Sequence, residues 1–166
     1  MKRPRPVSVI TLKSSGPSSA KSHPYPRRTP VLALDFDAIS VLVTTSHSNQ
    51  ITPADVAFAR ELAKEAAAFA VAVERMFRSL PTHGDTEMSR TVSSHSFKSG
   101  ERAWATCHTY SNRSPILALY MGPFNVSFCP AIPDEVTDTD LSFARDLARS
   151  AAAYLAACER FHAKQA

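Results

Sequence analysis

The sequence predicts an α+β fold in which one β-β-β-β-α unit occurs twice in tandem. Residues 52–80 have the spacing of a long helix and recur, 85 positions later, as residues 137–164. The match continues upstream without a gap, and 26 of the 71 residues in 7–77 are identical in the second copy. Unrelated segments would share roughly one residue in fifteen, so we predict the tandem duplication of a small domain.

Four strands are predicted in the second copy. Residues 91–98 have strand character, and residues 103–110 alternate larger with smaller side chains. Residues 115–121 and 124–129 each carry an apolar face and flank the dipeptide Gly122-Pro123. Period-two alternation on both sides of a turn dipeptide predicts an antiparallel hairpin.

The first copy repeats this hairpin at residues 31–45 but weakens the strand before it. Pro17, Pro24 and Pro26 fall in or beside the segment that matches residues 103–110. Proline has no N–H to donate to a neighbouring strand. We therefore predict a decayed second strand, with residues 1–30 forming a basic, proline-rich arm ahead of the hairpin.

Two helices are predicted, at residues 53–80 and 138–163, and both carry a start signal. Thr52 and Thr137 each precede an aspartate by three positions, the pattern of a capped helix. Beside the apolar face of the first helix runs a stripe of small side chains: Ala59, Ala63, Ala66 and Ala70. Such a stripe indicates that another element, most simply the second helix, approaches closely.

These elements predict antiparallel sheets with both alanine-rich helices packed on one face. Repeat 1 would occupy residues 1–80, a linker residues 81–90, and repeat 2 residues 91–166. Each half alone would be a small sheet with one helix, which is of marginal stability. We expect the halves to complete one another about a pseudo-twofold axis, as a monomeric pseudo-dimer or a homodimer of it.

The positive charge of the chain is concentrated at its beginning. Residues 1–34 hold seven Lys or Arg and no acid, whereas the rest of the chain holds 12 Lys or Arg against 15 acids. A basic arm binds nucleic acid or anionic surfaces. Two alternatives stay open, a leader that serves only solubility and an organellar transit peptide, since an acid-free start rich in Arg and Ser resembles one.

Composition also bears on location and on chemistry. Three cysteines without a CxxC pair indicate a reducing compartment, so we expect a cytoplasmic protein. Apolar runs are too short for a membrane span or a secretory signal. The sequence lacks zinc-ligand spacing, a glycine-rich phosphate loop and a GxSxG motif. We expect a protein that is not an enzyme and that has no cofactor, metal site or catalytic residue.

One short segment points the other way. Residues 31–37, VLALDFD, resemble the first motif of haloacid-dehalogenase-type phosphatases, in which an apolar strand ends in Asp-x-Asp. The resemblance implies that Asp35 would be a nucleophile and Asp37 an acid/base. However, no doubly wound succession of strands and helices follows, and the repeat matches the two aspartates to Tyr120 and Gly122. Two solvated carboxylates beside a turn explain the motif as well.

The most specific polar pattern is a duplicated His-x-Tyr-x-x-Arg. It comprises His23, Tyr25 and Arg28 in the first copy and His108, Tyr110 and Arg113 in the second. In the predicted strand 103–110, Trp104 shares a face with His108 and Tyr110. If that face is exposed, it offers rings for base stacking beside a phosphate-binding arginine; the alternative is a core tryptophan whose neighbours reach solvent.

We therefore expect a non-catalytic, nucleic-acid-binding protein that prefers single strands of DNA or RNA. The β-β-β-β-α repeat is similar, in topology alone, to the PUR-repeat and Whirly classes of single-strand binders. The alternative is an adaptor or inhibitor that binds a protein partner through an open sheet edge at the decayed strand. The predicted binding residues are Arg3, Arg5, Lys13, Lys21, His23, Tyr25, Arg27, Arg28, Trp104, His108, Tyr110 and Arg113.

Overall fold

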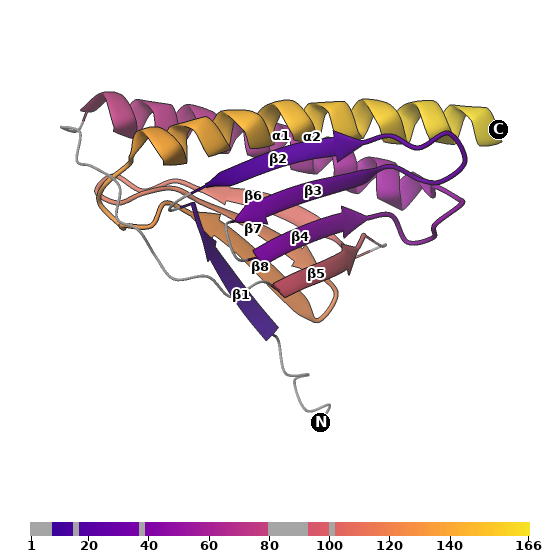
Figure 1. Ribbon diagram of the computed structural model, residues 1–166, viewed down its shortest axis with the longest axis horizontal. Coiled ribbons are helices and arrows are strands. Elements are labelled where there is room, and N and C mark those ends of the chain that lie inside the picture. Colours follow the sequence, from indigo (N-terminus) through magenta and orange to yellow (C-terminus); the bar gives the residue numbers. More distant parts are fainter. Residues whose placement is uncertain (1–7, 15–16, 37–38, 80–92, 100–101) are drawn as a thin grey trace.

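The fold comprises two four-stranded sheets and two long helices (Figure 1). The computed structural model describes residues 8–14, 17–36, 39–79, 93–99 and 102–166. The elements of the first half are β1 (Ser8–Lys13), β2 (Ser18–His23), β3 (Val31–Phe36), β4 (Ile39–Thr44) and α1 (Pro53–Ser79). Those of the second half are β5 (Ser93–Lys98), β6 (Trp104–His108), β7 (Ile116–Met121), β8 (Phe124–Cys129) and α2 (Asp138–Gln165).

The two halves exchange their first strands. Sheet A has the order β1-β8-β7-β6, and sheet B has the order β2-β3-β4-β5. Strand β1 runs parallel to β8, with Lys13 opposite Cys129, and β5 runs parallel to β4, with Lys98 opposite Thr44. Each sheet thus takes three strands from one half of the chain and one strand from the other.

The prediction of antiparallel sheets was wrong in one respect, because each sheet is mixed. The pairs β2–β3, β3–β4, β6–β7 and β7–β8 are antiparallel, as predicted, whereas β1–β8 and β4–β5 are parallel. Parallel neighbours need a long crossover connection. The connection from β4 to β5 has that length, since it contains α1.

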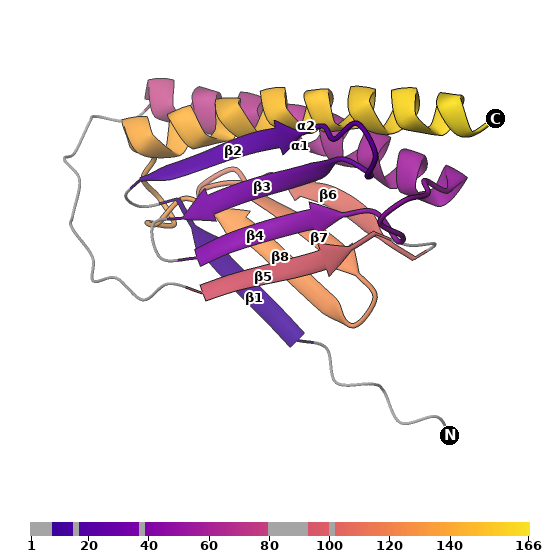
Figure 2. The same ribbon diagram turned by 45° about the vertical axis from the view of Figure 1, so that its right-hand side comes forward.

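The helices are exchanged as well. Helix α2 packs along β2 and β3 of sheet B, α1 packs along β6 and β7 of sheet A, and the two helices pack on each other (Figure 2). They run antiparallel, as two symmetric ion pairs show. Arg60 pairs with Glu159 at 2.9 Å, and Arg145, 85 positions after Arg60, pairs with Glu74 at 2.8 Å.

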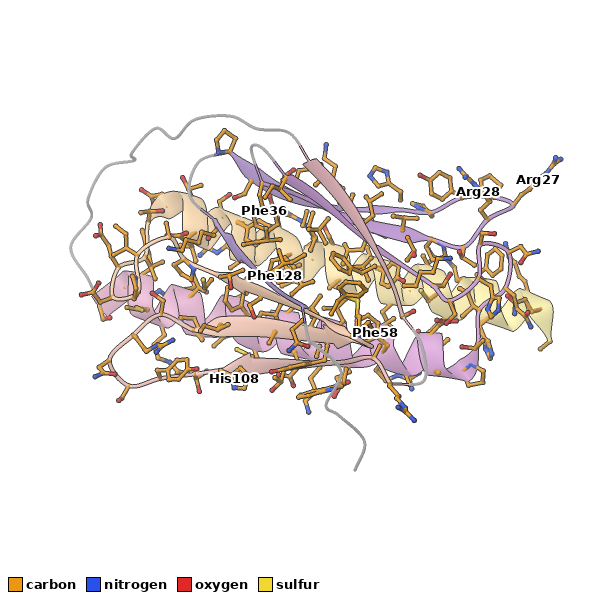
Figure 3. All side chains as sticks on the ribbon, turned by 90° about the horizontal axis from the view of Figure 1, so that it is seen from below. Arg27, Arg28, Phe36, Phe58, His108 and Phe128 are labelled. Atoms are coloured by element: carbon orange, nitrogen blue, oxygen red, sulfur yellow. The ribbon has the colours of Figure 1, made fainter. Side chains whose placement is uncertain are left out.

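The core lies between the two sheets and the helix pair. In the view from below, Phe36, Phe58 and Phe128 point into this space (Figure 3). The Phe36 ring stacks on Phe128 of sheet A at 5.6 Å and contacts Phe143 of α2 at 4.8 Å, measured between ring centroids. Burial of these large rings against all three walls stabilises the exchanged arrangement.

The decayed second strand is a further correction. Strand β2 is regular and pairs with β3 over its full length, from Ser18 opposite Phe36 to His23 opposite Val31. Pro17, Pro24 and Pro26 flank β2 instead of interrupting it, so they remove no ladder donor. Residues 1–30 are therefore not one arm, since β1 and β2 lie within them and Leu12 and Ala20 belong to the core.

Candidate nucleic-acid interface

Two aromatic rings, one exposed and one half-buried, stack on the outer face of sheet A. Trp104 of the edge strand β6 lies opposite Tyr120 of β7, with ring centroids 3.8 Å apart and planes 9° from parallel. Trp104 is 45% exposed, because the neighbouring Ala105 takes the inward position beneath α1. The tryptophan is thus a surface residue and not a core residue.

The duplicated His-x-Tyr-x-x-Arg motif forms the same cation–π pair in both halves. The Arg113 guanidinium lies 4.3 Å from the ring centroid of Tyr110, and that of Arg28 lies 4.7 Å from the centroid of Tyr25. Both tyrosines are exposed, at 44% and 38% respectively. Tyr110 was predicted within a strand, but β6 ends at His108, so both motif tyrosines lie in loops.

Strand exchange adds a lysine to each motif. On sheet B, paired positions run across the four strands from His23 through Val31 and Thr44 to Lys98 of the exchanged strand β5. On sheet A, the exchanged strand β1 places Lys13 opposite Cys129. Each site therefore combines a His-Tyr-Arg set from one half with a lysine from the other.

The register places Lys13 at the end of sheet A that also carries His108. Lys13 lies opposite Cys129, and His108 lies opposite Ile116 at the same end of the sheet. Burial raises the pKa of the Cys129 thiol. The Lys13 ammonium lowers it, the Asp140 carboxylate raises it further, and the Arg113 guanidinium lowers it.

Sheet B is hollowed on its outer face by a groove of about 520 Å³. Its lining includes the rings of Tyr25 and His23, the cations Arg28 and Lys98, and the apolar Leu42. None of the lining residues is acidic. The groove thus combines apolar and cationic side chains.

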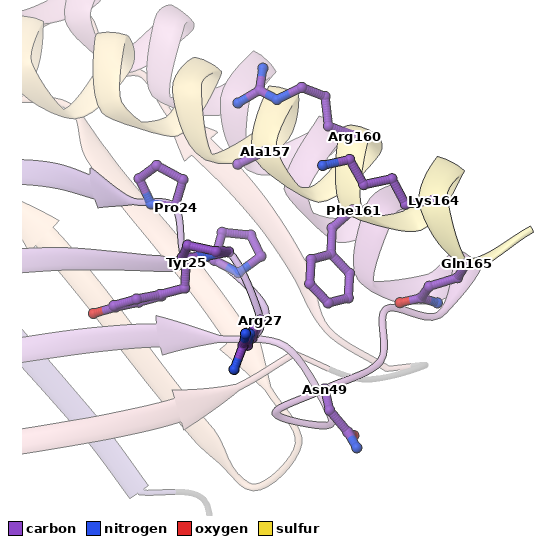
Figure 4. Close-up of a pocket in the computed structure, with 11 residues that line it drawn as sticks. Pro24, Tyr25, Arg27, Asn49, Ala157, Arg160, Phe161, Lys164 and Gln165 are labelled. Atoms are coloured by element: carbon purple, nitrogen blue, oxygen red, sulfur yellow. The ribbon is translucent and has the colours of Figure 1, made fainter.

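A second pocket of about 360 Å³ adjoins this groove at Tyr25 (Figure 4). It lies between the loop after β2 and the last turns of α2, where Phe161 supplies an apolar wall. Arg27, Arg160 and Lys164 line it, again without an acid. The matching pocket at the other end of the molecule has Asn112, Arg75 and Ser79 at these positions, and Asp134 where this pocket has Asn49.

These cations are not engaged in the ion pairs seen in the described part of the chain. All of those pairs join two helix residues, as for Arg78 with Glu74 and Arg149 with Asp146. The outer sheet faces therefore present positive charge without a neutralising carboxylate from the helices. A surface of this kind attracts phosphate groups.

The described residues provide little for catalysis. Burial, together with the charge of Glu65, raises the pKa of Cys107 to about 11, and burial raises that of Cys158 to about 12, so both thiols stay protonated.

Asp35 lies at the end of β3 and accepts a hydrogen bond of 2.5 Å from Ser40, while Asp37 lies outside the described residues. The sheets are mixed and not doubly wound, so the phosphatase resemblance stops at its motif. Within the described ranges, no cluster of three metal-ligating side chains occurs.

The sheet edges next to the helices are bonded, which bears on the protein-partner alternative. Glu61 and Glu65 of α1 accept hydrogen bonds from the backbone N–H groups of Ala105 and Cys107 in β6, at 3.3 and 2.6 Å. On the other sheet, the Ser150 hydroxyl donates to the Ala20 carbonyl of β2 at 2.7 Å. The edge that we expected to be open at β2 is thus covered by α2.

The structure divides the predicted binding residues into three groups. One group lies on or beside the outer face of sheet A and comprises Trp104, His108, Tyr110, Arg113 and Lys13. A second group lies on or beside the outer face of sheet B and comprises Lys21, His23, Tyr25, Arg27 and Arg28. The third group, Arg3 and Arg5, lies outside the described residues. Tyr120, Lys98, Arg160 and Lys164 were missed. Lys98 and Arg160 had a sequence signal, since they match Lys13 and Arg75 in the repeat.

Comparisons with protein-family models, with curated proteins and with solved structures find no match to this chain. Among the described residues, neither helix combines the length and apolar character needed to cross a membrane.

Proposed function

We propose that the protein binds single-stranded nucleic acid across the outer face of sheet A. The observation that carries this proposal is the stack of the exposed Trp104 on Tyr120, on a sheet face whose other end carries Lys13 and Arg113. Tyr120 stacks on the indole, and because Trp104 is 45% exposed its side chain is accessible to an unstacked base. Lys13 and Arg113 would contact the phosphates, because they lie at the end of the same sheet.

The preference for single strands follows from the type of contact. Bases in a duplex are stacked on one another, so a ring on a protein surface reaches them only when the strand is open. Aromatic rings also accept any base, because every base has a π-face. We therefore expect binding with little sequence preference and with a strong dependence on salt.

A titration of a labelled single-stranded oligonucleotide, followed by fluorescence anisotropy at low and moderate salt, tests the proposal. Replacement Trp104→Ala should weaken binding by about 1–3 kcal/mol, or roughly 5- to 150-fold in Kd. Trp104→Phe should recover part of the loss, and Val71→Ala, which removes an exposed apolar side chain on α1, serves as the control. Equal affinity of Trp104→Ala and wild type would contradict the proposal.

The duplication is part of the same proposal. Most elements of the second half begin 85 positions after their counterparts, as for Ser8 and Ser93 or Val31 and Ile116. The two helices pack on each other, and Ala59 and Ala66 of α1 are fully buried, as are the matching Ala144 and Ala151 of α2. We infer a duplicated, pseudo-twofold unit that acts in the cytoplasm, where its three free cysteines stay reduced.

A further inference from the structure

We propose that sheet B carries a second nucleic-acid-binding surface, which holds phosphates instead of bases, so that one chain bridges two nucleic-acid segments. This inference rests on the function proposed for sheet A. It identifies the second surface as the groove on sheet B together with the adjoining pocket at the end of α2.

The first support is the loss of stacking residues from sheet B. The positions on sheet B that match Trp104, Tyr120 and Asn125 are Ser19, Asp35 and Ser40, which lie opposite one another across β2, β3 and β4. A serine and a carboxylate offer no ring to a base, and Asp35 would repel a phosphate at that end. A nucleic acid on sheet B therefore has to lie at the opposite end, where the groove is.

The second support is a band of cations at that opposite end. The five Lys and Arg side chains that line the groove and the pocket are all exposed: Arg27, Arg28, Lys98, Arg160 and Lys164. The matching positions on the sheet A side are Asn112, Arg113, Lys13, Arg75 and Ser79, and Asp134 lies beside them. The sheet A side thus has more rings and three cations at these positions, whereas the sheet B side has fewer rings and five cations.

This band runs along one path. Tyr25 lines both the groove and the pocket, so the two hollows meet at its ring, and Arg28 lies over that ring. Figure 4 shows Tyr25 and Arg27 on one side of the pocket and Arg160 and Lys164 on the facing helix. A chain of phosphates following this path would pass Lys98 and Arg28 before it reached the helix.

The two surfaces face in opposite directions. In the view from below, Arg28 and His108 lie on opposite sides of the molecule, with the core phenylalanines between them (Figure 3). A strand bound on sheet A therefore leaves sheet B open, and each surface binds its own segment. Because sheet B acts through phosphates, its binding should be the more sensitive to salt and to competing inorganic pyrophosphate.

A co-capture experiment tests this inference with the full chain. One non-complementary oligonucleotide of about 12 nucleotides is tethered to a surface, and a second, dye-labelled one is supplied in solution. Wild-type protein should capture the labelled strand, and analytical ultracentrifugation should give one protein chain with two oligonucleotides. The double variant Arg28→Ala/Lys98→Ala should lose capture and retain a one-to-one complex in which Trp104→Ala still weakens binding. The exposed Lys64→Ala substitution on α1 is the charge control.

The outcomes separate the two proposals. A one-to-one complex for wild type, or capture by an assembly of two chains and two strands, would overturn the bridging inference and leave the function of sheet A intact. Capture that survives Arg28→Ala/Lys98→Ala would also overturn it. Absence of binding to any oligonucleotide would instead contradict the function proposed for sheet A.

Discussion

The hydroxyl of Ser99 donates a 2.6 Å hydrogen bond to the carboxylate of Asp55, which lies 44 positions earlier in the chain. Asp55 is the N3 residue of α1, and Ser99 directly follows the exchanged strand β5. The same link recurs at the other end of the molecule, where Ser14 follows β1 and donates to Asp140 of α2. Each helix start is therefore fastened to the strand that comes from the other half.

Asp55→Asn should destabilise the fold. The carboxylate is 1% exposed and accepts hydrogen bonds from Ser46 and Ser99 on one oxygen and from Thr52 on the other. An amide leaves at least one of these donors without an acceptor, at a cost of about 1–3 kcal/mol. Urea unfolding measures this loss of unfolding free energy. Asp134→Asn, a substitution in an exposed loop, is the control and should leave the urea midpoint unchanged.

Stability should also depend on pH through Asp55. Burial alone would raise the pKa of this carboxyl, but the hydrogen bonds from Ser99, Thr52 and Ser46 outweigh it and lower the pKa below its ordinary value of 3.8. A depressed folded-state pKa contributes stability above the unfolded value, and the contribution disappears as pH falls through the folded value. The free energy of unfolding should thus fall below pH 3.8 more steeply in wild type than in Asp55→Asn. Parallel pH profiles for the two proteins would contradict this assignment.

Glu65→Ala should open the edge of sheet A. The substitution removes the acceptor for the Cys107 N–H, which leaves an unpaired donor on the edge strand β6. Unpaired edges add strands from other molecules. Sedimentation of Glu65→Ala should show self-association that grows with protein concentration. Glu74→Ala, which removes a carboxylate elsewhere on α1, should keep the association state of the wild type.

The sequence predicted the elements well and their partners poorly. Strand and helix periodicity located β3, β4, α1 and the whole second half within a few residues, because these patterns are local. Strand exchange had no local signal, since β1 and β5 share Val-Ser at their start and Lys-Ser at their end and fit either sheet equally. Lys98 was missed as a site residue for the same reason, because only the exchange places it beside His23.

The exchange predicts that separated halves do not fold as monomers. Fragments 1–85 and 86–166 would each lack one strand of their own sheet and the helix that covers it. Circular dichroism and sedimentation should show each fragment unfolded or self-associated, and mixing should restore a one-to-one complex. A folded, monomeric fragment would show that the halves are independent.

The salt dependence of binding should count the phosphate contacts. Lys13→Ala and Arg113→Ala each remove one cation from the sheet A surface, so each should reduce the slope of log K against log salt by about 0.7 for a single strand. Affinity at low salt should fall as well. Lys64→Ala should keep the wild-type slope, and an unchanged slope in both sheet A variants would exclude these cations as phosphate contacts.

The central claim, that single strands stack on the outer face of sheet A, has a built-in reporter. Trp104 is the single tryptophan of the chain, so its fluorescence reports on that face alone. Addition of a single-stranded oligonucleotide should quench this fluorescence to saturation, with the midpoint moving to higher concentration as salt rises. Binding that is evident by anisotropy but leaves the Trp104 emission unchanged would contradict the account.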